Sequence, residues 1–296
     1  MLDQSATDEI YVQIPAYRDQ ELSKTLLDLY AKACHPERLR TGVVWQRAET
    51  ETLSPAVLDL PNLEIETVPH EQSQGCNWAR SLLQKRWRGE PYTMLLDSHQ
   101  RFVPDWDLKV LEMYAQLRQS GAPKALLTAY LPSYEPDREP GGRKKRPYKI
   151  YPLGREEGVL TKLTSHPIPF WTSLRRPITA DFISLHFLFT TGDFNREVPF
   201  DPEIYFFGDE VLTGLRAFTS GYDLFHPHTI VGWHCYKRTT RVAHWNDHAS
   251  WHERHRFSLA KLRRLFQGRH RGDFGLGSHR TLRDYEDHIM TKLVEE

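Results

Sequence analysis

Short apolar segments alternate with longer segments of helical period along the first 130 residues of the chain. We expect strands near 9–14, 41–46, 63–68, 94–96 and 126–130, and helices near 20–32, 77–87 and 105–118. Strands that alternate with helices in this way form a mostly parallel sheet with helices packed on its faces. The fold class is therefore α/β. Ligands in such sheets bind beyond the carboxyl ends of the strands, so a site is expected there.

The predicted strand at 94–96 runs directly into the triplet Asp97-Ser98-His99. Side chains alternate along an extended chain, so Asp97 and His99 are expected on one side, with Ser98 turned away. A carboxylate and a neutral imidazole suit Mn²⁺, or Mg²⁺, better than Ca²⁺, which prefers a shell of oxygens. An Asp-x-His at a strand end is a plain polar turn about as often as a metal site. Our hypothesis is that this strand end holds a divalent cation that binds a nucleotide-sugar diphosphate.

Other polar residues fall at the ends of predicted strands or helices. Pro15 is expected to end the first strand, with Ala16, Tyr17 and Arg18 in the following loop, and Gln46 ends the second strand. Downstream, a predicted helix at 210–220 opens with two carboxylates and ends at a glycine, and an isolated histidine follows a later strand. These residues are Asp209, Glu210, Gly221 and His234.

Each of these residues also has a purely structural interpretation. Carboxylates such as Asp209 and Glu210 stabilise the first turn of a helix through its dipole, without any catalytic role. His234 could bond to the backbone of its own strand. Arg80, on the helix before the triplet, could make a surface salt bridge.

The second half of the chain is less regular. Residues 132–176 are expected to be an irregular insertion, and their basic run Arg143–Arg146 is either a solvated loop or a flap that meets a diphosphate or an acidic acceptor. We expect a strand near 182–191, a strand pair at 224–228 and 230–236, and helices at 245–266 and 282–293. This organisation divides the chain into a catalytic domain at 1–240 and a C-terminal helical extension at 241–296.

The composition excludes some classes of partner. Lys plus Arg equals Asp plus Glu, at 39 each, so the charge balance does not indicate a nucleic-acid or anionic-membrane partner. The polar start of the chain does not have the pattern of a signal peptide, and no apolar run reaches the length of a membrane span. The three cysteines are scattered without metal or disulfide spacing. A cytoplasmic protein is the simplest expectation.

Several motifs along the chain together carry a family resemblance. They resemble the GlcNAc-transferase family that includes the enzymes modifying hydroxyproline on the Skp1 protein (glycosyltransferase family 60), and more distantly the polypeptide GalNAc transferases. The similarity covers nearly the whole chain, with one departure at Asp209, where the family usually has glutamate. The motifs are Ile14-Pro15-Ala16-Tyr17-Arg18-Asp19, Gly75-Cys76-Asn77-Trp78-Ala79-Arg80, Leu96-Asp97-Ser98-His99-Gln100-Arg101-Phe102, Trp106-Asp107, Val198-Pro199-Phe200-Asp201-Pro202, Phe206-Phe207-Gly208-Asp209-Glu210, Gly221-Tyr222-Asp223, His234-Cys235-Tyr236-Lys237-Arg238 and Gly275-Leu276-Gly277.

This resemblance implies a GT-A fold, a UDP-sugar donor and a metal held by Asp97, His99 and His234, the first two in a DXD-like motif. It implies donor binding by the loop that follows the first strand, by the end of the second strand, by the helix before the triplet and by the triplet itself. The residues concerned are Pro15, Ala16, Tyr17, Arg18, Gln46, Arg80, Asp97 and Ser98.

The resemblance also implies that Asp209 and Glu210 bind sugar hydroxyls or orient the acceptor. It suggests that GlcNAc, or a related HexNAc, is transferred with retention of configuration to a hydroxyl group, such as that of a protein hydroxyproline. One alternative is an inverting transferase with Asp209 or Glu210 as the base. Another is a non-catalytic protein that binds a glycan or a nucleotide.

Overall fold

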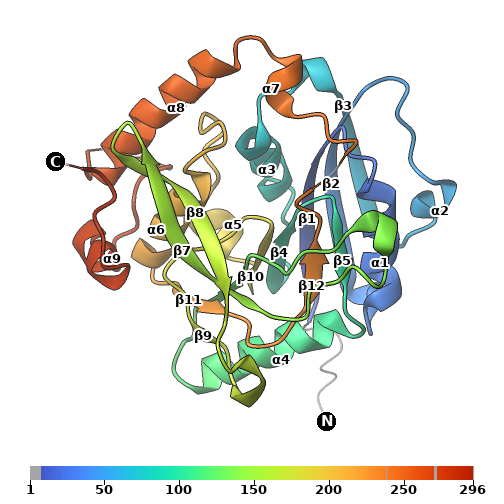
Figure 1. The fold of residues 1–296 in the computed structure, drawn as a ribbon, viewed down its shortest axis with the longest axis horizontal. Helices are drawn as coiled ribbons and strands as arrows, with labels where there is room; N and C mark the ends of the chain where they lie inside the picture. Colours follow the sequence, from blue (N-terminus) through green and yellow to red (C-terminus); the bar gives the residue numbers. More distant parts are fainter. Residues whose placement is uncertain (1–7, 238, 270–271, 296) are drawn as a thin grey trace.

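The computed structural model describes residues 8–237, 239–269 and 272–295. Its centre is one eight-stranded sheet, in the order β3-β2-β1-β4-β10-β6-β11-β9 (Figure 1). The strands are β1 (Ile10–Tyr17), β2 (Leu39–Arg47), β3 (Leu63–Pro69), β4 (Tyr92–Leu96), β6 (Ala125–Thr128), β9 (Ile178–Thr179), β10 (Phe187–Thr191) and β11 (Asp223–His226). β1 to β4 are parallel, whereas β10 runs antiparallel to both β4 and β6. The α/β prediction with a mostly parallel sheet is confirmed.

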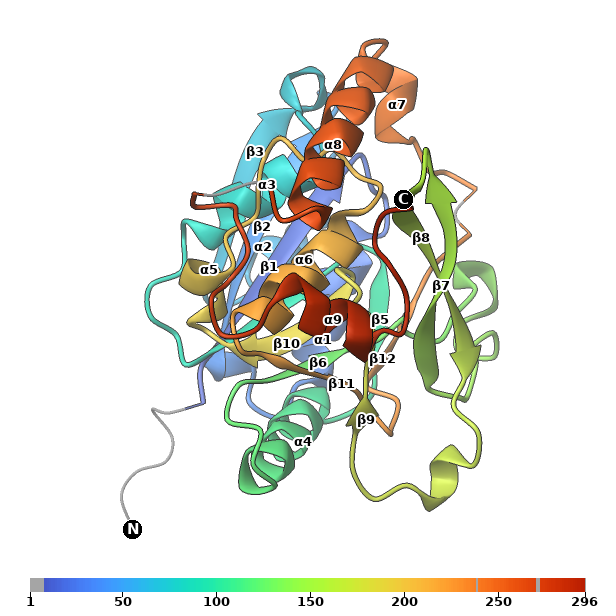
Figure 2. The same cartoon turned by 90° about the vertical axis from the view of Figure 1, so that its left-hand side faces the viewer.

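Helices cover both faces of this sheet because successive strand residues point to opposite sides. Met94 and Leu96 of β4 pack with one group of helices, and Leu95 packs with the other group. On the first face lie α1 (Leu22–Lys32), α2 (Pro55–Leu58) and α4 (Trp106–Gln119), and on the second lie α3 (Cys76–Gln84), α5 (Phe194–Glu197) and α6 (Asp209–Thr219). Two further helices, α8 (Trp251–Phe266) and α9 (Leu282–His288), pack on α6 (Figure 2).

The first strand is longer than the sequence suggests, because β1 continues through Pro15 to Tyr17. Its pairing with β4 ends at Gln13, while its pairing with β2 continues to the strand end. Proline has no N–H to offer a neighbouring strand, and at Pro15 the pairing with β4 has already ended. The prediction that Pro15 ends the strand was therefore wrong.

The expected irregular insertion contains a long hairpin, β7 (Tyr148–Glu156) and β8 (Val159–Pro167), which stands beside the main sheet (Figure 1). Its two-residue turn places both Glu157 and Gly158 at positive φ, as hairpins of right-handed twist require. The basic run is only partly solvated, because Arg143 pairs with Glu139 at 2.8 Å and its guanidinium lies over the Trp233 ring.

Three further predictions from the sequence need correction. The strand expected near 182–191 begins only at Phe187, and the helix expected at 245–266 is divided into α7 (His244–Asp247) and α8. The segments 224–228 and 230–236 do not pair with each other, since β11 pairs with β6 and β9. Instead β12 (Gly232–His234) pairs with β5 (Gln100–Phe102), with His234 opposite Gln100.

None of the helices in the described part of the chain combines the length and apolarity that a bilayer span needs. Residues 1–7, on which the signal-peptide prediction mainly rests, lie outside the described residues. Arg238, the last residue of the motif that begins at His234, also lies outside them.

Candidate active site

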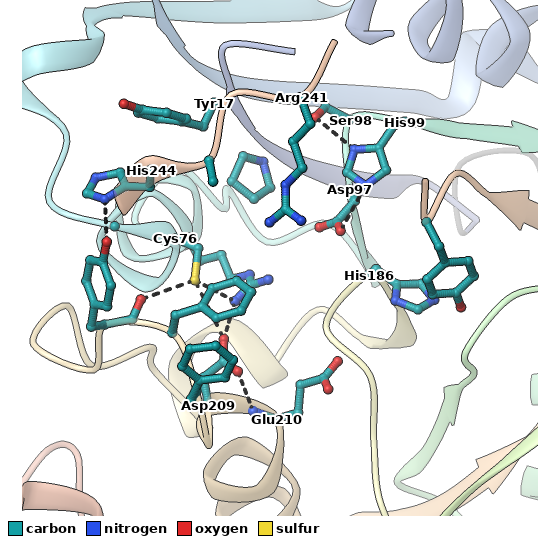
Figure 3. Close-up of a pocket in the computed structure, with 18 of the residues that line it drawn as sticks. Tyr17, Cys76, Asp97, Ser98, His99, His186, Asp209, Glu210, Arg241 and His244 are labelled. Carbon is teal, nitrogen blue, oxygen red and sulfur yellow. Dashed lines mark hydrogen bonds and ion pairs between the residues drawn. The ribbon is translucent and has the colours of Figure 1, made fainter. Parts of the chain in front are cut away.

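A cavity of about 560 Å³ opens at the carboxyl ends of β1, β2 and β4 (Figure 3). The cavity is lined by the strand ends, the starts of α3 and α6 and segment 241–245 after β12. The β7–β8 hairpin, Tyr130 and His186 also contribute to its lining. Of the site residues predicted from sequence, ten line this cavity: Pro15, Tyr17, Gln46, Arg80, Asp97, Ser98, His99, Asp209, Glu210 and His234. Ala16 is fully buried in the core, and Arg18 does not line the cavity.

Three potential metal ligands meet in the cavity. One ligand atom each from Asp97, His99 and His234 all lie within 4.8 Å of one another. The Nε2 atoms of His234 and His99 lie 3.3 and 3.5 Å from Oδ2 of Asp97. The triplet is a bend between β4 and β5 rather than an extended strand. The two side chains therefore converge through the bend and not through the strand alternation on which we based their prediction.

Asp19 orients the second of these ligands. Its Oδ2 accepts hydrogen bonds from Nδ1 of His99 and from Oγ of Ser98, both at 2.7 Å. Because Nδ1 of His99 donates to Asp19, its Nε2 is left to face Asp97. A carboxylate behind a ligating histidine is the usual outer partner in metal sites.

The donor set fits a divalent cation. It offers one carboxylate and two imidazoles, which are ligands for Mn²⁺ and related ions. Burial alone would raise the pKa of Asp97, but the hydrogen bond from His234 and the charge of His99 hold that pKa well below its usual range. Asp97 is therefore ionised, as a metal ligand must be.

The two carboxylates at the start of α6 are held differently from each other. Oδ2 of Asp209 accepts from Nη1 of Arg80 at 2.8 Å, so Arg80 makes a buried ion pair rather than a surface one. Oε2 of Glu210 accepts from the Tyr130 hydroxyl at 2.6 Å, and Oε1 accepts from the backbone N–H of Leu185 at 2.9 Å. Burial and the charge of Asp209 raise the pKa of Glu210 to about 7.

Residues of the expected C-terminal extension close the cavity over the end of β1. The Tyr17 hydroxyl and Nη1 of Arg18 donate to the Asp247 carboxylate at 2.7 and 2.9 Å. His244 bonds through Nδ1 to the Tyr205 hydroxyl and through Nε2 to Ser73, at 2.6 and 3.0 Å. The Arg241 side chain points into the cavity toward Asp97 (Figure 3).

Sequence reasoning missed Asp19, Tyr130, His186 and Asp247. Asp19 is the last residue of the Ile14–Asp19 motif, and this position was a usable signal. His186 was hidden in a predicted strand, although it lines the cavity and its ring stacks on that of His234, with 4.2 Å between centroids. Burial lowers the pKa of His186 well below its usual range, so its imidazole is neutral.

Comparison with solved structures shows which fold this geometry belongs to. GalNAc-T7, solved with UDP, GalNAc and Mn²⁺, superposes with a TM-score of 0.61 at 14% identity, over 97% of this chain and 57% of that one. S. aureus TarS 1–349 in complex with UDP-GlcNAc superposes with a TM-score of 0.55 at 14% identity, over 95% of this chain and 70% of that fragment. These likenesses show the GT-A glycosyltransferase fold.

The chain spans 36% of one longer TarS chain, with a TM-score of 0.53 at 12% identity over 77% of this chain. No curated protein matches the sequence. The model of the family described as "Glycosyltransferase (GlcNAc)" matches residues 9–61 and 54–294, which together cover almost the whole sequence. The chain therefore belongs to the GlcNAc glycosyltransferase family.

Proposed function

We propose that this protein is a metal-dependent glycosyltransferase that moves GlcNAc, or a related HexNAc, from a UDP-sugar to a hydroxyl acceptor. The observation that carries the proposal is the convergence of Asp97, His99 and His234 in the same cavity as Asp209 and Glu210. Family membership supports the reaction type. The UDP, GalNAc and Mn²⁺ of the GalNAc-T7 structure and the UDP-GlcNAc of the TarS structure support the class of donor.

Asp97, His99 and His234 would hold the cation, with Mn²⁺ the first choice and Mg²⁺ the second. When bound, such an ion supplies Lewis-acid stabilisation of the negative charge that develops on the departing diphosphate. Asp19 keeps His99 in the tautomer that presents Nε2 to the site.

The end of β1 and the neighbouring Gln46 would bind the uracil and ribose. The Tyr17 side chain belongs to this group, together with Pro15 and the backbone of Ala16. Arg18, which does not line the cavity, would support the group from outside through its bond to Asp247. Tyr17 and Arg18 already bond to Asp247, so segment 241–248 would cover the bound nucleotide. Ser98 and Asp97 would lie at the diphosphate end.

Arg80 would act on the donor sugar through Asp209, because its Nη1 already holds that carboxylate. Asp209 and Glu210 would then face sugar hydroxyls or orient the acceptor. With retention of configuration, which we propose from the resemblance to the hydroxyproline-modifying enzymes, no general base is required.

The pKa of Glu210 supports a second candidate, an inverting transferase. A carboxyl group whose pKa is raised to about 7 is suited to take a proton from an acceptor hydroxyl near neutral pH. Glu210 is the better base of the two carboxylates, because Asp209 is bound in an ion pair with Arg80. The anomeric configuration of the product, read by NMR, separates retention from inversion.

We further propose a hydroxyproline-bearing protein as one acceptor, a catalytic unit at 1–240 and an extension at 241–296 that contributes Arg241 and His244 to the cavity. Three free cysteines, Cys34, Cys76 and Cys235, are compatible with work in a reducing compartment such as the cytoplasm.

The test is a panel of UDP-sugars incubated with the protein and Mn²⁺, with hydrolysis or transfer followed by UDP release. We expect UDP-GlcNAc or another UDP-HexNAc to turn over, and Asp97→Ala to abolish turnover. Asp193→Ala is the matched control, since Asp193 is an exposed aspartate that pairs with Arg196 of the short helix that follows it. Absence of turnover with every UDP-sugar, or full activity in Asp97→Ala, refutes the proposal. Calorimetric binding of a UDP-sugar without product identifies a binding protein instead.

A further inference from the structure

A buried histidine outside the proposed ligand set packs against one of the ligands. His186 is 7% exposed and lies immediately before β10, in the buried segment that precedes this strand. We propose that His186 is a positioning residue, an inference that rests on the proposed function. The ring of His186 fixes the ring plane of the proposed metal ligand His234, and the loop that carries His186 links this ligand to the carboxylate of Glu210.

Ring geometry supports the first half of the proposal. The rings of His186 and His234 are nearly parallel, at 21°, with centroids 4.2 Å apart. The other ring neighbours of His234, His99 and Tyr236, meet it at 58° and 66°. Only a near-parallel contact covers the face of an imidazole, so among these neighbours His186 is the one that opposes tilting of the His234 ring out of its plane.

Hydrogen bonds fix His186 itself. The backbone N–H of Leu131 donates to its Nε2 at 3.0 Å, so this nitrogen carries no proton. The proton is therefore on Nδ1, which donates to Oγ of Ser184 at 2.9 Å. Both ring nitrogens are used within the protein, and the imidazole that faces His234 is neutral. A neutral ring adds no positive charge beside a bound cation.

The same loop holds both oxygens of Glu210. The N–H of Leu185, the residue before His186, donates to Oε1, and the Ser184 side chain also bonds to this carboxyl group. Oε2 accepts from the Tyr130 hydroxyl, and the Tyr130 ring stacks on His186 at 24° with centroids 5.2 Å apart. A shift of His186 would therefore move the metal ligand and the carboxylate together.

Two substitutions separate the stacked ring from its hydrogen bonds. His186→Gln keeps a side-chain oxygen that can accept from Leu131 but has no ring, whereas His186→Phe keeps a ring but leaves the Leu131 N–H without an acceptor. Metal affinity is measured directly, by electron paramagnetic resonance of free Mn²⁺, and stability by thermal unfolding.

We expect His186→Gln to weaken Mn²⁺ binding about 10-fold or more, the usual effect of losing an outer-shell partner. His186→Phe should bind Mn²⁺ within about 3-fold of wild type yet unfold at a lower temperature than His186→Gln, because a buried N–H is left unpaired. A purely structural role predicts the opposite, with Mn²⁺ affinity following stability. In steady-state assays, His186→Gln should lower kcat at saturating Mn²⁺ because Glu210 has moved.

His226→Gln is the matched control. His226 is also buried and uses both ring nitrogens, with Nδ1 bonded to the Thr128 carbonyl oxygen and Nε2 to the Ile150 N–H. It does not line the cavity. Its loss should lower stability and leave Mn²⁺ affinity unchanged. Wild-type Mn²⁺ affinity in His186→Gln, or an equal loss in His226→Gln, overturns this inference alone. If wild-type protein binds no Mn²⁺, both the inference and the proposed function fail.

Discussion

The ion pair between Arg80 and Asp209 offers the sharpest test of how the cavity is built. The two side chains are only 8% and 11% exposed, and their N–O distance is 2.8 Å. Arg80→Met removes the cation while keeping most of the aliphatic bulk. The Asp209 carboxylate then remains buried, with Asn77 at 3.4 Å as its nearest remaining side-chain nitrogen donor. Removing one partner of a buried pair costs about 3–5 kcal/mol, because the other charge stays desolvated.

This loss is large enough to measure in two ways. In urea titrations followed by tryptophan fluorescence, the free energy of unfolding should fall by about 3–5 kcal/mol. For a chain of this size the melting temperature should fall by about 6–10 °C, at about 2 °C per kcal/mol. Removing both charges in Arg80→Met/Asp209→Asn should recover part of the loss, with a coupling energy of about 2 kcal/mol.

The matched control is Arg196→Met, which breaks the exposed pair between Arg196 and Asp193, whose side chains are 68% and 53% exposed. Solvent screens such a pair, so the melting temperature of Arg196→Met should stay at the wild-type value. A loss below about 1 kcal/mol in Arg80→Met, or a double variant whose losses simply add, would refute a desolvated, mutually dependent pair.

Three further predictions address the rest of the site. Asp19→Asn should weaken Mn²⁺ binding about 10-fold, since His99 loses its charged partner, and unchanged affinity by electron paramagnetic resonance would contradict this role. The pKa of Glu210 is raised from 4.5 to about 7, so its protonated form favours the fold. The free energy of unfolding of the wild type, relative to that of Glu210→Gln, should therefore fall by about 3 kcal/mol between about pH 4.5 and 7 and stay level above pH 7. Parallel pH profiles of the two proteins would exclude the raised pKa of Glu210. Gly208→Ala should cost about 2 kcal/mol or more, because φ there is +86° and the new Cβ would lie 2.6 Å from a leucine methyl of α8. Gly268→Ala, with φ of +66° and open space, should cost only about 1 kcal/mol, and equal losses would show that the close contact is irrelevant.

The first half of the fold could be predicted because its signals are local. Strands such as β4 are continuous apolar runs, and α3 has a clear apolar stripe, so the alternation of strands and helices follows from neighbouring residues. The hairpin of β7 and β8 could not be found in this way. Its strands carry prolines, lysines and arginines instead of a continuous apolar run, and they meet at the Glu157-Gly158 turn. Pairing across that turn compensates for a weak strand propensity.

The candidate site was predictable to the extent that its residues sit in short motifs. Asp97 and His99 could be identified together because one residue separates them, although the bend that joins them differs from the expected strand. The motif position of Asp19 was a usable signal, but neither its contact with His99 nor the contact of His186 with His234 could be derived from the sequence. The first contact is a hydrogen bond and the second is a ring stack. They span 80 and 48 positions of the chain, and contacts at such separations leave no periodic trace in the sequence.

The two-stranded sheet of β12 and β5 determines whether the third proposed ligand, His234, reaches the other two. β12 and β5 share only three residue pairs, and His234 occupies the last of them, opposite Gln100. A slip of one residue would reverse the faces of β12 and point the His234 imidazole away from Asp97. Two features oppose such a slip. The backbone of His234 also bonds to the backbone of residues 132 and 134. Gly232 lies so close to the Arg101 carbonyl that a Cβ at this position would stand 2.6 Å from the carbonyl oxygen, so only a glycine fits there. The geometry of the proposed metal site thus depends on the register of three residue pairs. Gly232, which lets the two strands approach, is needed for this register as His234 is needed for the ligand set.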